Sequence, residues 1–184
     1  YDGKKGIKVI PCYYKKDYPE WSDRGDGPGA PVAIHQPNSP VIATGKRDGS
    51  KIRLPNGNYL EETASYFVMV ETATGGFTPA LITMKSTQLN VSKKWNSMMK
   101  TTQFPDGKGG FATPPMFGVV YNLASTLQKN DKGSWYGWVV TMDRILGQED
   151  KSLYLGAKDF GANVSKGAVQ TKSDVEEKSD STPY

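Results

Sequence analysis

Apolar and polar residues alternate along several short stretches of the chain, and this spacing is typical of half-buried β-strands. The opening stretch, residues 6–14, places Ile7 and Val9 on one side and Lys8 on the other. Residues 32–51 give only short strand-like pieces, because prolines and glycines interrupt them. The chain therefore predicts a first strand followed by broken strands.

Four stronger strands follow, and they are expected to form two hairpins. Gly75-Gly76 marks the turn of the first hairpin, and Pro79 indicates an edge position in its second strand. The second hairpin turns at the polar residues 128–133. The four strands are predicted over residues 59–72, 77–84, 116–127 and 134–146.

Two stretches have helical spacing instead. After Ser86, a plausible N-cap, apolar side chains recur on one stripe that ends before Phe104-Pro105. A closing helix is predicted over residues 152–166. The two stripes consist of Val91, Trp95, Met98 and Thr102 in the first helix and of Leu153, Ala157, Phe160 and Val164 in the second.

This order of elements predicts a mainly β fold with two helices. A helix between the third and fourth strands of a five-stranded antiparallel set is the order of an OB-type barrel, with the C-terminal helix packed outside it. A generic α+β sandwich would give a similar pattern. We expect one domain over residues 1–169 and a flexible acidic tail over 170–184.

Composition excludes several classes of function. The 184 residues include one cysteine, Cys12, and one histidine, His35, so a disulfide framework, a cysteine-based zinc site and a His-rich metal centre are excluded. No phosphate-binding or nucleophile-elbow motif appears. Cys12 and His35 read as a buried thiol and a loop imidazole. We expect a non-enzyme without metal or cofactor, and no membrane partner, because no apolar run is long enough to span a bilayer.

Charge gives the first positive indication of function. The net charge is +4, yet residues 173–184 carry four acids and one lysine, so the preceding 172 residues carry +7. A basic body with an acidic end is typical of proteins that bind a polyanion. An ordinary soluble domain with a solvated terminus is the alternative.

Aromatic and basic residues lie together around the second hairpin turn. Lys129 and Lys132 precede Trp135 and Tyr136, two adjacent residues that a strand points to opposite faces. An exposed ring beside lysines suits single-stranded nucleic acid, since bases stack on rings and phosphates attract cations. The alternative is that the rings are core packing. Further basic residues could extend the surface, namely Lys93, Lys94, Arg47, Lys51 and Arg53.

Four stretches of the sequence resemble a family of small tailed-phage proteins described as single-stranded-DNA-binding or replication-accessory proteins. They read GIKVIPCYY, FTPALITMKSTQLNVSKKWNSMM, TPPMFGVVYNLASTLQKNDKGSWYGW and LYLGAKDFGANVSKGAV. The resemblance implies an OB-type barrel that coats single-stranded DNA during phage replication or recombination, in the cytoplasm of the infected host.

The resemblance also implies a role for the acidic tail, which ends in Tyr184. Single-stranded-DNA-binding proteins often end in such a tail, and its terminal aromatic residue docks replication partners. Lys178 interrupts the acidic residues here. A phage structural or assembly protein, either capsid-decorating or tail-associated, is the alternative function.

Overall fold

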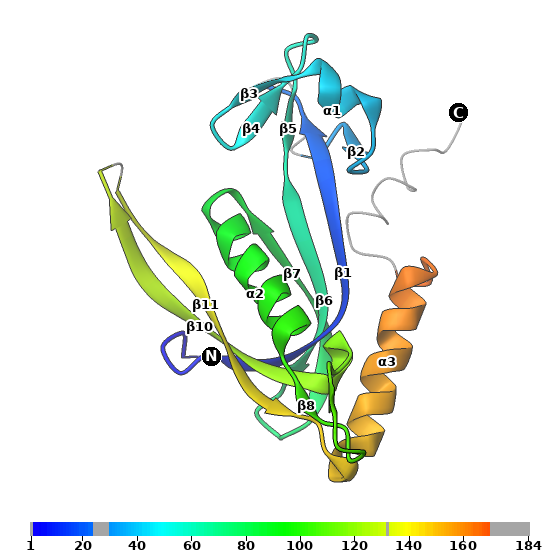
Figure 1. The fold of residues 1–184 in the computed structure, drawn as a ribbon. Helices are drawn as coiled ribbons and strands as arrows, with labels where there is room; N and C mark the ends of the chain where they lie inside the picture. The colour runs from blue at the N-terminus through cyan, green and yellow to red at the C-terminus, as the bar shows by residue number, and fades with distance from the viewer. Residues whose placement is uncertain (1, 24–29, 132, 170–184) are drawn as a thin grey trace, which may run out of the picture.

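The computed structural model describes residues 2–23, 30–131 and 133–169. Its centre is a curled antiparallel sheet whose five long strands lie in the order β11, β10, β1, β6, β7 (Figure 1). Among the described residues, β7 and β11 do not pair, so the sheet curls without closing. The strands are β1 (Ile7–Trp21), β6 (Thr63–Glu71), β7 (Phe77–Lys85), β10 (Val119–Asn130) and β11 (Gly133–Ile145).

The described part of the chain between β1 and β6 folds as a small unit on the far end of β1, here called the insertion. Tyr18–Trp21 of β1 pair with β2 and β5, after the earlier residues of β1 have paired with β10 and β6. Gly57 makes the turn between β4 and β5 with φ +90°. The elements of the insertion are β2 (Ala33–His35), α1 (Pro40–Thr44), β3 (Lys46–Asp48), β4 (Lys51–Arg53) and β5 (Tyr59–Glu61).

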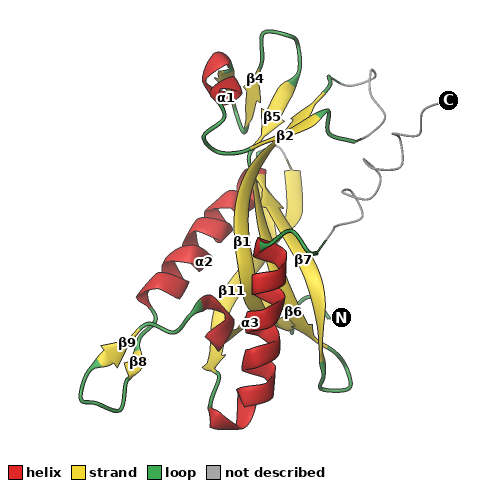
Figure 2. Ribbon diagram, turned by 90° about the vertical axis from the view of Figure 1, so that its right-hand side faces the viewer, coloured by secondary structure: helices red, strands yellow, loops and turns green. Residues whose placement is uncertain are grey.

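The long helices α2 (Leu89–Thr101) and α3 (Lys151–Ser165) cover opposite faces of the sheet (Figure 2). Short elements connect them to the strands. These are η1 (Ser86–Gln88), the strands β8 (Phe104–Pro105) and β9 (Phe111–Ala112), η2 (Met116–Gly118) and η3 (Gln148–Asp150).

The concave face of the sheet holds the main core, with Trp95 of α2 at its centre. Trp95 is fully buried, stacks on Tyr66 at 4.3 Å between ring centroids, and meets Tyr121 edge-on at 5.6 Å. The Tyr66 hydroxyl lies 2.7 Å from the hydroxyl of Ser92, which is also buried. Ring pairs of this kind add stability beyond their buried area, so α2 is fixed in the curl of the sheet.

The convex face is covered by α3. Ile10, Cys12 and Val120 alternate with the concave-face residues of their strands and pack against Ala157 of the helix. The helix approaches the strand most closely at Gly161, where a Cβ atom would lie 2.3 Å from the Cys12 carbonyl oxygen. A glycine is therefore needed at this contact.

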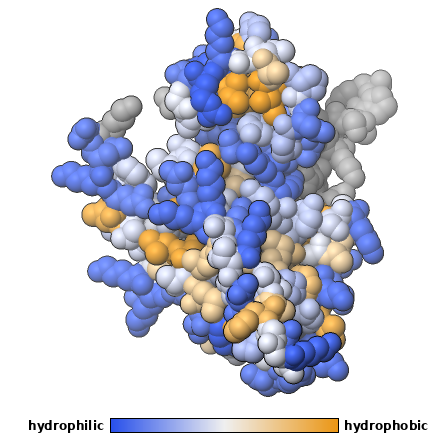
Figure 3. Space-filling model, in the orientation of Figure 1, coloured by the Kyte–Doolittle hydropathy of each residue, from blue (hydrophilic) through white to orange (hydrophobic). Residues whose placement is uncertain are grey.

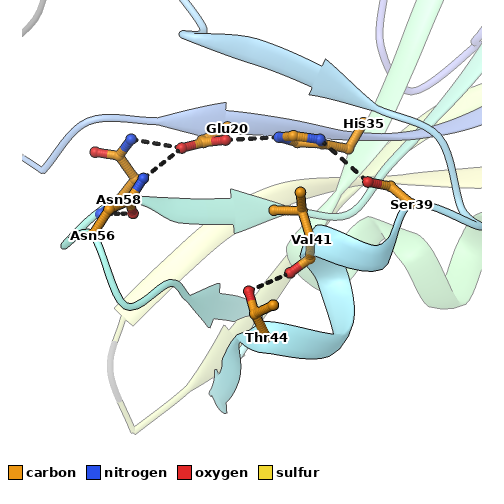
Figure 4. A network of polar contacts seen from close by, with 7 residues as sticks. All are labelled: Glu20, His35, Ser39, Val41, Thr44, Asn56 and Asn58. Atoms are coloured by element: carbon orange, nitrogen blue, oxygen red, sulfur yellow. Dashed lines mark hydrogen bonds and ion pairs between the residues drawn. The ribbon is translucent and has the colours of Figure 1, made fainter.

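A buried carboxylate holds the insertion together. Glu20 is 7% exposed and accepts hydrogen bonds from Asn56 Nδ2 at 3.1 Å and Asn58 Nδ2 at 2.6 Å (Figure 4). Its other oxygen lies 2.7 Å from His35 Nε2, and His35 Nδ1 lies 3.4 Å from Ser39 Oγ. The bond from Asn58, above all, holds the pKa of Glu20 below its usual range, with His35 and Asn56 adding to it. One side chain thus joins β1, β2, the β4–β5 turn and the residue before α1.

Most expected elements are present. A mainly β fold with a curled antiparallel sheet and two long helices is confirmed, as are the hairpin at Gly75-Gly76 and the edge position of Pro79. The closing helix begins and ends within one residue of its predicted limits and buries its predicted stripe. The predicted tail, residues 170–184, lies outside the described residues.

Several expectations were wrong in detail. Residues 59–72 form two strands, β5 and β6, rather than one, and residues 128–130 extend β10 rather than belonging to a turn. The first strand is longer than predicted, because β1 continues to Trp21 to support the insertion. Ser86 begins a 3-10 turn rather than α2 itself. The stripe of α2 is rotated toward Ser92 and Met99, because the Tyr66 hydroxyl takes Ser92 as a buried partner.

Glu20→Gln should lower stability by about 2 kcal/mol at pH 7, because it removes a buried charge that accepts three polar contacts. Since the folded-state pKa of Glu20 is lowered, its contribution is full above the unfolded value of about 4.3 and is lost as the pH falls through the folded value. Thermal melts of wild type and variant should therefore differ most at pH 7 and converge below about pH 4. Asp48→Asn, which removes an exposed partner of Arg53, is the control and should change stability by less than about 1 kcal/mol. A constant difference at all pH values would contradict this role.

Two glycines of α3 should respond oppositely to alanine. Gly161→Ala forces a methyl group into the Cys12 carbonyl and should destabilise by about 1–3 kcal/mol. Gly156→Ala meets nothing within 4 Å and should stabilise the helix by roughly 0.5–1 kcal/mol. Urea unfolding of both variants measures the difference. Equal effects at the two positions would show that α3 does not pack as closely as described.

Candidate nucleic-acid interface

The β10–β11 hairpin projects beyond the sheet as a two-stranded ribbon, here called the arm (residues 126–130 and 133–137; Figure 1). Its inner neighbours end early, since β1 pairs with β10 only from Ile7 to Val9 and Gly3 makes the last bond, to the Ser125 amide. An isolated two-stranded ribbon is only marginally stable in water. The arm therefore depends on its base, where it joins the sheet, for much of its stability.

Strand alternation sets which side chains the arm presents. Tyr136 shares its face with Trp138 and stands opposite Leu127 in the register. Trp138 packs against the concave core, but the arm has left the core by Tyr136 and Leu127, which are 71% and 60% exposed. The exposed ring therefore faces the side of the sheet that carries α2.

Trp135 points to the other face of the arm and is half-buried. It borders a small pocket of about 200 Å³ together with Thr87, and its Nε1 has no partner among the described residues. Beside it, the Gln88 side chain accepts a hydrogen bond from the Trp138 amide at 3.1 Å. Gln88 thereby links the free edge of β11 to the start of α2 and steadies the base of the arm.

The outer surface of α2 is basic. Lys93, Lys94 and Lys100 are exposed, and the helix contains no acidic residue. None of the three forms a salt bridge with another described residue, whereas Lys8, Lys16 and Lys85 do. Their charge therefore remains available to an anion.

The insertion contributes a second group of cations. Lys51 Nζ lies 3.5 Å from the centroid of the Tyr59 ring, and the Arg53 guanidinium lies 5.5 Å from the same centroid. Asp23 and Asp48 pair with Arg53 and, Asp23 first, raise its pKa. Arg47 is exposed on β3. Arg53 is thus partly neutralised, while Lys51 sits over an aromatic ring.

The arm and the insertion lie on either side of the upper end of α2 (Figure 1). In the same view, hydrophilic atoms project from the arm and the insertion, and hydrophobic atoms lie along the arm and below it (Figure 3). By alternation Tyr136 and Lys129 share the face of the arm that continues as the concave face, and Lys93 and Lys94 are exposed on α2, which covers that face. Trp135 has the opposite orientation in the strand and lines the pocket beside Thr87, while Lys132 and Tyr184 lie outside the described residues.

Three residues of this region escaped sequence reasoning. Leu127 could have been found, because alternation across the turn places it opposite Tyr136. Nothing in the sequence beyond its aromatic ring marked Tyr59 as a candidate, because its contact with Lys51 depends on the pairing of β4 with β5. Gln88 gave none at all.

Reactive chemistry has little support in the described residues. Burial raises the pKa of the Cys12 thiol to about 12, so the thiol stays protonated at neutral pH. Cys12 lies under α3, while His35 binds Glu20 in the insertion. No cluster of acids, histidine and cysteine able to hold a metal occurs among the described residues. None of their helices has the length and apolar content of a membrane-crossing segment.

Comparison with known proteins identifies a family. A family model described as Pam3 phage gp34-like protein matches residues 1–170. Neither a curated protein nor a solved structure matches the chain. The family model covers nearly the whole sequence and includes the curled sheet, the insertion, both long helices and the arm. The chain therefore belongs to the Pam3 phage gp34-like protein family.

Proposed function

We propose that this phage protein binds single-stranded DNA with little sequence preference and acts in phage replication or recombination. The observation that carries the proposal is the 71% exposed ring of Tyr136 on a projecting arm, on the same side of the sheet as the lysines of α2. Bases of every kind stack on such a ring, and phosphates seek free lysines. No catalytic step is part of the proposal.

We also propose that the curled sheet is an OB-type barrel left open between β7 and β11. In support, five antiparallel strands follow the order β7, β6, β1, β10, β11, and α2 lies between the third and fourth of them in sequence. In OB folds, the loop between strands one and two and the loop between strands four and five bind oligonucleotides. Here those positions are the insertion and the tip of the arm.

In this arrangement each group has a separate task. Tyr136 stacks on a base, with Leu127 beside it as an apolar support. Lys129, Lys93 and Lys94 neutralise phosphates, and Lys51 with Tyr59 offers a second ring and cation on the insertion. Contacts to rings and phosphates carry no base code, so the binding is expected to be largely independent of sequence.

Two further parts of the proposal concern where the protein acts and which proteins it recruits. Replication in the host cytoplasm supplies single-stranded DNA, and the acidic tail with Tyr184 recruits phage replication proteins. Both rest on the sequence resemblance.

A phage assembly protein is the second candidate. The observation in its favour is Phe111, which is 70% exposed on the β8–β9 hairpin, away from the proposed DNA surface. An exposed ring on a projecting hairpin suits a protein contact. Absence of DNA binding in the experiment below, with self-association intact, would favour this candidate.

Fluorescence anisotropy with labelled oligo(dT), duplex DNA and RNA tests the proposed function. We expect oligo(dT) to bind more tightly than duplex, with a log–log salt slope of about −2 to −4, from roughly −0.7 per neutralised phosphate. Tyr136→Ala should cost about 1–3 kcal/mol, roughly a 5- to 150-fold rise in Kd. Lys94→Gln should make the salt slope shallower by about 0.7.

Two exposed residues of α3, on the opposite face of the sheet, provide matched controls. Leu155→Ala removes a 44% exposed apolar side chain, and Lys158→Gln removes an exposed lysine. Both should bind as the wild type does. Equal affinity for duplex and single strand, or equal losses at Tyr136 and Leu155, would count against the proposed surface.

A further inference from the structure

Two features at the end of the molecule away from the insertion have no part in the proposed DNA surface. One is the small hairpin of β8 and β9, which projects from the body and carries Phe111 (Figure 2). The other is a surface pocket of about 510 Å³ between the start of α3 and the β6–β7 turn. Figure 2 places the hairpin and the β6–β7 turn on opposite sides of α3.

Hydrogen bonds within the turn, to the side chain and the backbone of Asp106, hold the hairpin in shape. The Asp106 carboxylate accepts hydrogen bonds from the amides of Lys108 and Gly110 at 2.8 and 2.9 Å, and the Asp106 amide donates to the Gly110 carbonyl at 3.0 Å. The first two bonds, the one from Lys108 foremost, lower the pKa of Asp106. The negative charge of Asp106 is thus satisfied within the turn. Phe111 and the ammonium of Lys108 are left as the groups that the hairpin presents.

The pocket has an apolar floor and an acidic rim. Met69, Phe77 and Leu153 are the partly buried apolar residues of its lining. Its charged residues are three acids and one arginine, and that arginine, Arg144, already pairs with Asp150. The full set of charged lining residues is Glu71, Arg144, Glu149 and Asp150. Gly156 also lines the pocket, and a Cβ built there meets nothing within 4 Å.

We propose that Phe111 of one copy inserts into this pocket of a second copy, so that the protein self-associates head to tail. The pocket volume admits a phenyl ring, and the apolar floor matches it. Lys108, three residues before Phe111, would then lie near the acidic rim. Because the hairpin and the β6–β7 turn beside the pocket lie on opposite sides of α3, the two sites of one copy are expected to meet different neighbours. The contact is then heterologous, and copies add in series rather than closing as a two-fold dimer.

Complementary charge argues for a second copy as the occupant. The hairpin offers a ring and a cation, and the pocket offers an apolar floor with the exposed carboxylate of Glu149 at its rim. A contact centred on one ring buries less than a standard interface, so association is expected in the micromolar range. The proposal is independent of DNA binding. Were both correct, neighbouring copies would touch along one DNA strand and bind it cooperatively.

Sedimentation velocity without DNA, over about 5–200 μM protein, tests the contact. The wild-type mass should rise with concentration. Phe111→Asp removes the ring, and Gly156→Leu adds an apolar side chain to the pocket lining, at a position where a Cβ atom meets nothing within 4 Å. Each variant alone should remain a monomer. Because Phe111→Asp keeps an intact pocket and Gly156→Leu keeps an intact hairpin, their equimolar mixture should form a dimer and nothing larger.

A second pair of variants, in which the charges of the two sides are exchanged, tests the contact if one of the first variants folds poorly. Lys108→Glu and Glu149→Lys should each weaken association at least threefold alone, and the double variant should recover it. Any of three results would overturn the proposal. These are a wild type that stays monomeric at every concentration, a mixture that stays monomeric, and a Phe111→Asp variant that associates normally. The Kd of Phe111→Asp for a short oligo(dT), measured by anisotropy, should match that of the wild type. Failure of the contact between copies can therefore be told apart from failure of DNA binding.

Discussion

The fold depends on the length of β1, because this one strand belongs to both parts of the molecule. Its first residues pair with β10 and β6 to form the curled sheet, and Tyr18–Trp21 pair with β2 and β5 of the insertion. Glu20, near the end of the strand, gathers the loops of the insertion around one buried carboxylate. Side-chain alternation along the same strand divides the two cores, since Val9 faces α2 and Ile10 faces α3.

Because α2 and α3 cover the two faces of the sheet, the proposed binding surfaces lie at its periphery. Trp95 fixes α2 in the concave face by stacking on Tyr66, so the lysines of that helix point to solvent. The hairpin of β10 and β11 outruns β1 and projects its exposed ring beyond the core. The proposed DNA surface and the proposed contact between copies therefore use different projections from the packed centre, the arm for DNA and the β8–β9 hairpin for protein.

The spacing of apolar residues correctly predicted those features that depend only on residues close together in the sequence. The apolar stripe of α3 at Leu153, Ala157, Phe160 and Val164 faces the sheet as its spacing requires, and the opposite orientation of Trp135 and Tyr136 follows from strand alternation alone. Features that depend on contacts between residues far apart in the sequence were missed. The rotation of α2 follows from the Tyr66–Ser92 contact, and the insertion follows from pairing with the end of β1 and from Glu20, neither of which leaves a periodic signal in residues 32–51.

The central claim is that the arm and α2 form one surface for single-stranded DNA. Ultraviolet cross-linking of the wild-type protein to oligo(dT), followed by mass spectrometry of the joined peptides, tests it most directly, because it reports contacts without altering any residue. The account predicts cross-links at Tyr136 and in the peptide that contains Lys93 and Lys94. Cross-links confined to α3, or equal labelling of all exposed aromatic residues, would contradict it.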